Sequence, residues 1–149
     1  MEARKPGRPR TGPLLDKPVT FRLWKSMLPM VEIGAKMQAR RAKLPNRPIP
    51  SSSYGTWIRA LIEHAFIHRA DLPPEQARLF MHEASDTTRE TAKVSMFISE
   101  EIRVKLRMME CELQAFDWSI DLDRNKTLLM IALAFAEQLN SQIKTTPLP

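Results

Sequence analysis

A β-strand pattern near the start of this chain stands apart from the helical patterns around it. The segment is "KPVTFRLW", residues 17–24, in which the apolar residues Val19, Phe21 and Leu23 alternate with residues of other kinds. An isolated strand leaves its backbone N–H and C=O groups unpaired, so it needs a second strand from this chain or from another copy. The source of that second strand decides the fold.

A second alternating segment follows about 75 residues later in the chain. In "AKVSMFIS", residues 92–99, the apolar residues Val94, Met96 and Ile98 share one face. Two helical patterns come after each strand, so the order strand, helix, helix occurs twice. The sequence therefore predicts that the two strands pair with each other inside one chain, and that four helices cover one face of the pair.

The helical patterns have identifiable starts and ends. After the first strand, one helical pattern ends at the proline-rich "LPNRPIP", and a second ends near Ala70. After the second strand, Ser99 and Asp123 are the expected N-caps of two further helices, because their side-chain oxygens can accept hydrogen bonds from the first helical N–H groups. The predicted fold class is mainly α, with one two-stranded antiparallel ribbon.

The chain divides into four segments that we expect to form one domain. Residues 1–16 are expected to form a flexible basic arm, and residues 17–70 a first strand-helix-helix unit. Residues 71–91 are expected to form a linker with a short helix, and residues 92–142 a second strand-helix-helix unit.

Positive charge is concentrated in the first third of the chain. Residues 1–47 contain 12 Lys and Arg against 3 Asp and Glu, whereas the remaining residues contain 11 against 14. Such a concentration favours a polyanion as a partner. A solvated face that keeps the protein in solution explains the charge equally well.

Several classes of function find little support in the sequence. No apolar run is long enough to span a bilayer and the N-terminus lacks a secretory signal, so we expect a cytoplasmic protein without membrane contact. His64 and His68 have metal-ligand spacing but lack further ligands nearby, and no catalytic set is evident. We therefore expect no enzyme activity, no metal and no cofactor. Cys111 and the tryptophans are expected in or beside the core; the tryptophans are Trp24, Trp57 and Trp118.

The repeated order resembles the ribbon-helix-helix family of DNA-binding proteins, in which two subunits pair their strands into one ribbon. The resemblance covers about residues 17–142 and implies a single-chain pseudo-dimer that is a monomer in solution. The second helix also resembles the family, with a serine-rich start and the pair Ile58 and Arg59 in "SSSYGTWIRALIEHAF". The other half departs from this pattern, because Asp123 stands at the cap and Leu129 in place of the arginine.

The tandem arrangement within one chain resembles the VirC-type accessory proteins of T-DNA transfer. This resemblance implies a non-enzymatic factor that binds double-stranded DNA near a transfer origin or T-DNA border, beside a relaxase or other DNA-processing proteins. A transcriptional repressor with the same fold is an alternative. An antitoxin-like helical module that binds other proteins is an alternative of a different class.

The resemblance and the strand pattern together nominate DNA-contacting residues. The outward strand residues are predicted to read base edges in the major groove: Thr20, Arg22, Lys93, Ser95 and Phe97. The starts of the second and last helices are predicted to hold phosphates through their N–H groups and nearby side chains. These side chains are Ser52, Ser53 and Tyr54 in the first half and Arg124, Asn125 and Lys126 in the second. The arm is predicted to add minor-groove or nonspecific attraction through Arg4, Lys5, Arg8 and Arg10.

Overall fold

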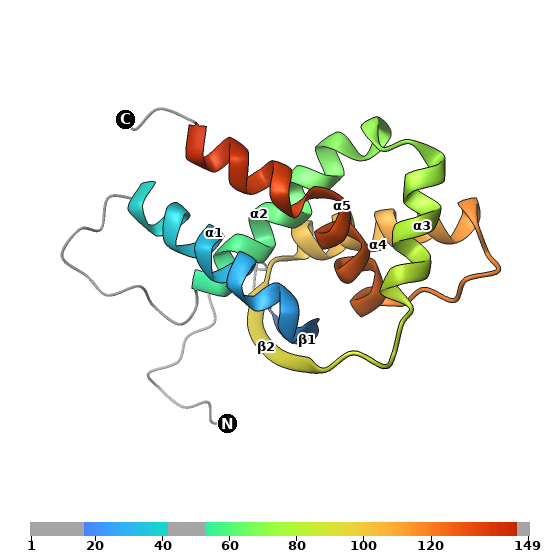
Figure 1. Ribbon diagram of the computed structural model, residues 1–149, viewed down its shortest axis with the longest axis horizontal. Helices are drawn as coiled ribbons and strands as arrows, with labels where there is room; N and C mark the ends of the chain where they lie inside the picture. Colours follow the sequence, from blue (N-terminus) through green and yellow to red (C-terminus); the bar gives the residue numbers. More distant parts are fainter. Residues whose placement is uncertain (1–16, 42–52, 146–149) are drawn as a thin grey trace, which may run out of the picture.

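The structure is a computed structural model that describes residues 17–41 and 53–145. This part of the chain forms two β-strands and five α-helices. The elements follow one another in the order β1 (Lys17–Trp24), α1 (Leu28–Arg41), α2 (Ser53–His68), α3 (Pro74–Ala84), β2 (Thr91–Ile98), α4 (Glu100–Phe116) and α5 (Arg124–Thr145). Short 3-10 turns precede α1 and follow α2. The order strand, helix, helix therefore occurs twice, with α3 in the connection between the two halves (Figure 1).

The two strands pair with each other, as the sequence predicts. They form an antiparallel ribbon of eight residue pairs, from Lys17 opposite Ile98 to Trp24 opposite Thr91. The inner face of the ribbon is apolar and buried, and the ring of Phe21 at its middle is fully enclosed. Burial of one face fixes the register, because a shift by one residue would turn every apolar strand residue toward solvent.

The second helix of each half packs against the strand of the other half. Helix α2 contacts β2, α5 contacts β1, and α4 packs against both α2 and α5. The ribbon lies at one edge of these helices, below α1 and α2 in the view of Figure 1. Because of this crossed packing, neither half encloses a core of its own, and a single core joins them.

The predicted caps of α4 and α5 are confirmed. The Ser99 hydroxyl accepts a hydrogen bond from the N–H of Ile102 at 3.2 Å, and an Asp123 carboxylate oxygen accepts one from the N–H of Lys126 at 2.7 Å. Each cap satisfies a backbone donor that has no partner within the helix. The local sequence therefore sets where both helices begin.

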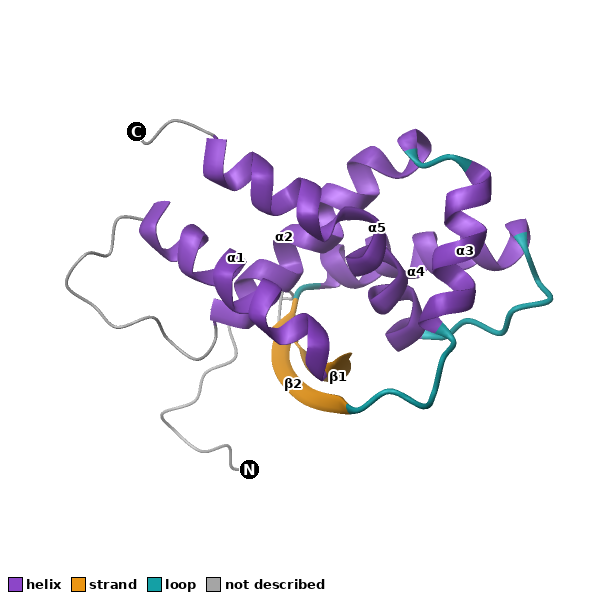
Figure 2. Ribbon diagram, viewed as in Figure 1, coloured by secondary structure: helices purple, strands orange, loops and turns teal. Residues whose placement is uncertain are grey.

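Helix α3 does more than connect the two halves. It starts at Pro74, where the missing N–H of proline costs nothing, and it packs its buried side chains against α5; these are Ala77, Met81 and Ala84. Figure 2 shows the loops that join α3 to α2 and β2, on the side of the molecule away from α1. The linker thus covers part of the core.

Two expectations about burial are wrong. Cys111 is exposed, because it lies about 200° around α4 from Met109, on the side away from the core. Trp118 is 84 % exposed in the loop between α4 and α5, whereas Trp24 and Trp57 are buried as expected. In the described ranges, no helix is both long and apolar enough to cross a bilayer.

Candidate nucleic-acid interface

The strand residues that point away from the helices form one solvent-facing surface, which we call the outer ribbon face. All of its residues are exposed; they are Pro18, Thr20, Arg22, Lys93, Ser95 and Phe97. The five residues predicted to read bases therefore share one surface. From residue 18 to residue 22 this surface extends roughly 13 Å, at about 3.3 Å per strand residue, which is close to four base-pair steps of B-DNA at about 3.4 Å each.

Two cations lie directly opposite each other on this face. Arg22 is paired with Lys93 across the ribbon. Among the residues that the structure describes, neither side chain forms an ion pair. Like charges at directly opposed positions destabilise an antiparallel ribbon. A site of this kind suits a partner that presents hydrogen-bond acceptors or negative charge.

The rest of the face differs in chemistry from this cationic end. At its centre the hydroxyls of Thr20 and Ser95 lie 3.0 Å apart and share a hydrogen bond. At the other end Phe97 lies opposite Pro18, and its side chain is 58 % exposed. The face therefore runs from a cationic pair through a hydroxyl pair to an apolar pair, so its two ends are chemically distinct.

The start of α2 is held against β2. An Arg59 guanidinium nitrogen donates a hydrogen bond to the carbonyl of Phe97 at 2.5 Å. A Cβ atom on Gly55 would lie 3.1 Å from the Cβ of Met96, so glycine allows the helix to approach the ribbon closely. These two contacts hold the first two turns of α2 against β2, with Gly55 facing the inner-face residue Met96.

Among the predicted phosphate ligands of the first half, the structure describes the side chain of Tyr54. Its hydroxyl donates a hydrogen bond to Glu32 at 3.2 Å, and partial burial together with that carboxylate raises the pKa of Tyr54. Ser53 is the first residue of α2. The remaining predicted residues lie outside the described ranges; they are Ser52, Arg4, Lys5, Arg8 and Arg10.

The start of α5 is held against β1 by different chemistry. The Asn125 side chain accepts a hydrogen bond from the N–H of Arg22 at 2.6 Å and donates one to the carbonyl of the same residue at 2.9 Å. The amide thus engages the backbone that carries the Arg22 guanidinium. The Lys126 ammonium donates to the carbonyl of Asp121 at 3.2 Å, and Asp123 places its carboxylate at the helix N-terminus.

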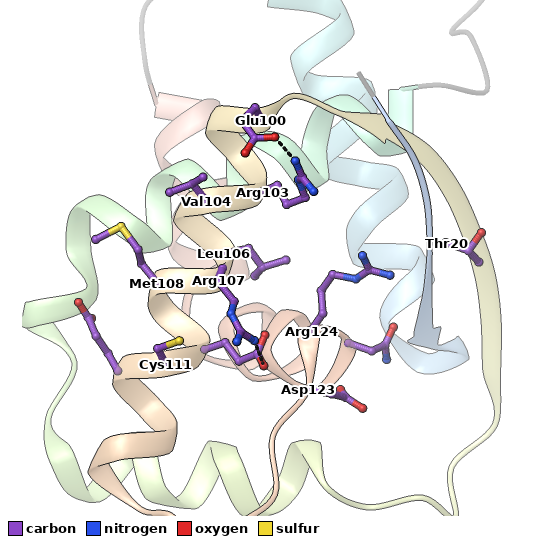
Figure 3. Close-up of a pocket in the computed structure, with 13 residues that line it drawn as sticks. Thr20, Glu100, Arg103, Val104, Leu106, Arg107, Met108, Cys111, Asp123 and Arg124 are labelled. Carbon is purple, nitrogen blue, oxygen red and sulfur yellow. Dashed lines mark hydrogen bonds and ion pairs between the residues drawn. The ribbon is translucent and has the colours of Figure 1, made fainter. Parts of the chain in front are cut away.

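A groove of about 890 Å³ separates α4 from the ribbon and from the start of α5 (Figure 3). Two arginines on its α4 wall are paired within that helix, Arg103 with Glu100 and Arg107 with Glu110. The Arg124 side chain points into the space between α4 and the ribbon, with its guanidinium carbon 5.6 Å from the ring centre of Phe21. Within the part of the chain that the structure describes, Arg124 makes no ion pair, so its charge is available to a ligand.

Comparison with known proteins gave no match. No protein-family model matches the chain, and no curated protein or solved structure matches it either. The site is therefore interpreted from its geometry.

Sequence reasoning missed the contacts that two residues, Arg59 and Asn125, make with the ribbon. Arg59 was noted as part of a family pattern, but its contact with Phe97 was not predicted, and Asn125 was expected to hold phosphate rather than the edge of β1. Both contacts join residues far apart in the chain, and local patterns carry no signal for them. An asparagine in the first turn of a helix was the only available hint.

The histidine pair makes contacts of its own. His64 shares a hydrogen bond with the Gln138 side chain at 2.9 Å, and His68 contacts an Asp71 carboxylate oxygen at 3.1 Å. In the described ranges, no group of three or more metal-ligating residues comes together.

Proposed function

We propose that this protein is a single-chain ribbon-helix-helix protein that binds double-stranded DNA with its outer ribbon face in the major groove. The observation that carries the proposal is the exposed pair of cations, Arg22 and Lys93, opposed across the ribbon with no described acidic partner. A two-stranded ribbon fits the major groove, where each base pair presents its own pattern of donors and acceptors.

Each part of the face suits a different feature of the base edges. Arg22 and Lys93 can donate to the O6 and N7 acceptors of guanine. The central hydroxyls, Thr20 and Ser95, can both donate and accept hydrogen bonds. The exposed ring of Phe97 suits the methyl group of thymine, which would cover apolar surface that is otherwise in water.

Phosphate contacts would flank the ribbon on both sides. The first turn of α2 presents backbone N–H groups and the positive end of the helix dipole, which attract phosphate. On the α5 side, Arg124 offers a cation beside the ribbon, although the neighbouring carboxylate of Asp123 opposes an anion there. We therefore propose unequal backbone contacts in the two halves.

The biological role that we propose is that of an accessory factor in DNA processing or transfer, acting near a transfer origin or T-DNA border. This part rests on the tandem arrangement and on its resemblance to VirC-type proteins. It agrees with the unequal ends of the outer ribbon face, because a process that runs in one direction along DNA needs an oriented mark. One chain supplies both strands, so we expect a monomer by sedimentation before DNA is added.

Selection of bound duplexes from a random library tests the proposal. We expect a short, non-palindromic preferred sequence with a guanine-rich end, and an affinity that falls steeply as salt rises. Lys93→Ala should relax the preference at that end. The matched control is Lys144→Ala, which removes the same charge near the far end of α5. At 1.5 Å per residue, that position is roughly 30 Å from the start of the helix beside the ribbon. Salt-independent binding, a perfect inverted repeat or equal effects of both variants would contradict the proposal.

A further inference from the structure

A second cavity, of about 360 Å³, lies among α2, α3, α4 and α5 and shares no lining residue with the outer ribbon face. Its inner wall consists of buried core side chains from α4 and α5: Met109, Met130, Ile131 and Phe135. Ala77 of α3 and Leu72 of the preceding loop line it from the linker side. The space opens to solvent on one side, so it is a cleft whose floor is the core rather than an enclosed void.

The polar groups that line the cavity satisfy one another. Arg69 donates one hydrogen bond to the carboxylate of Glu112 at 2.9 Å and another to the carbonyl of Phe66 at 2.5 Å. Its guanidinium also lies 4.0 Å from the centre of the Phe66 ring. The remaining lining is aliphatic, thioether or aromatic. A charged ligand would find no unpaired counter-ion among these described residues, and its burial would be costly.

The apolar surface continues out to solvent at the end of α2. Ile67 lines the cavity and is 72 % exposed, and the neighbouring Ala70 is exposed as well. The two methionines of the inner wall can adapt their flexible side chains to guests of different shape. Together these features give an apolar interior with an open, apolar approach.

From this lining we infer that the cavity is a binding site for an uncharged, apolar small molecule. Its volume lies within the roughly 300–1,000 Å³ of small-molecule sites, and apolar cavities in proteins take up apolar guests in place of water. The inference does not depend on DNA binding, because it rests on residues that take no part in the proposed DNA contacts.

Toluene serves as the probe, and benzoate serves as its charged counterpart. NMR spectra of protein labelled with ¹³C at the methionine methyl groups report on the cavity. We expect toluene to give saturable chemical-shift changes at Met109 and Met130. Met37, which is on α1 and does not line the cavity, should show no change. Benzoate should give no such change. The absence of saturation up to the solubility of toluene, equal changes at Met37, or equal binding of benzoate would overturn the inference.

Two cavity-filling variants make the test specific. Ala77→Leu fills the cavity from the α3 side, and Ala70→Leu fills its mouth from an exposed position where folding is not at risk. Each should weaken toluene binding at least tenfold. The matched control is Ala115→Leu, the same change at an exposed position of α4 that does not line the cavity, and it should bind toluene as the original protein does. Unchanged binding in folded Ala70→Leu would overturn the inference.

Discussion

The starts of α2 and α5 attach to the same ribbon in two different ways. Arg59 of α2 reaches the carbonyl of Phe97 with one arm of its guanidinium, whereas Asn125 of α5 engages both the N–H and the carbonyl of Arg22. Phe97 and Arg22 occupy matching places, each being the sixth residue of a strand in the repeated pattern when the count starts at Lys17 and Ala92. The two halves thus perform one structural task with unrelated side chains.

The difference shows what two halves of one chain can do that two identical subunits cannot. In the first half the attachment is a half-buried cation in the second turn of α2, and no acidic residue lies in the first turn of that helix. In the second half it is a neutral amide next to the capping carboxylate of Asp123. The two surfaces that we propose to face DNA therefore differ in charge as well as in the residues proposed to read bases. Such divergence is impossible in a homodimer, where one sequence must serve both sides.

Replacing side chains by alanine should affect DNA binding differently at the two ends of the outer ribbon face. The loss of binding free energy at the Arg22 end is the largest effect that we expect. Arg22→Ala should cost about 1–3 kcal/mol of binding free energy on the preferred duplex, because a bidentate contact with guanine is lost. Phe97→Ala should cost less and should relax the preference at the opposite end of the site. Fluorescence anisotropy with single-base variants of the duplex measures both. Loss of preference at the same end in both variants would contradict an oriented face.

Asn125→Ala tests the attachment of α5 to the ribbon. It removes two hydrogen bonds to the backbone of Arg22, each worth about 0.5–1.5 kcal/mol, so the free energy of unfolding should fall by roughly 1–2 kcal/mol. Urea denaturation followed by circular dichroism gives the value. Lys126→Ala is the control, because its side chain makes a single exposed contact in the same turn. A loss no larger than that of the control would show that the amide does not hold the strand.

Arg59→Ala tests the attachment of α2 and should have a smaller effect. The hydrogen bond to the Phe97 carbonyl and a long one to the Thr56 hydroxyl, at 3.4 Å, are lost, so we expect the free energy of unfolding to fall by about 1 kcal/mol or less. Arg59→Lys keeps the charge but not the planar fork, and it should recover little of the loss. The same urea measurements compare the two attachments directly. Full recovery by lysine would mean that charge, and not geometry, holds the helix.

Asp123→Asn isolates the effect of the carboxylate at the start of α5, and we expect the smallest change here. Asparagine caps helices about as well as aspartate, so stability should change by less than about 0.5 kcal/mol. Affinity for DNA should rise about two- to fivefold, since a negative charge near the phosphates is removed, an effect of about 0.3–1 kcal/mol. Anisotropy titrations at low salt measure the gain. An unchanged affinity would place the start of α5 away from the DNA backbone.

The parts of the fold that depend on local pattern could be predicted from the sequence. Alternation in residues 17–24 and 92–99 predicted two strands with buried inner faces, and their pairing follows because each needs a partner. The caps at Ser99 and Asp123 were predicted because capping depends on one side chain and the three residues after it.

Features that depend on the angle around a helix or on long-range contacts could not be predicted in this way. Cys111 was placed in the core because apolar residues surround it in sequence, but the core side of α4 is set by Met109 and the residues spaced three or four from it. The contact of Asn125 with Arg22 spans 103 residues, and no local pattern encodes it. The outward position of Thr20, Arg22, Lys93, Ser95 and Phe97 was predicted, whereas the contacts of Arg59 and Asn125 with the ribbon backbone were not.

Intramolecular pairing of the strands also has a consequence for synthesis of the protein. Thr20 and Ser95 are 75 residues apart, so at about 5–20 residues per second β1 leaves the ribosome roughly 4–15 s before its partner. During that interval both edges of β1 and its apolar face are uncovered, which is a hazard for aggregation. The first half therefore stays without its strand partner until β2 emerges.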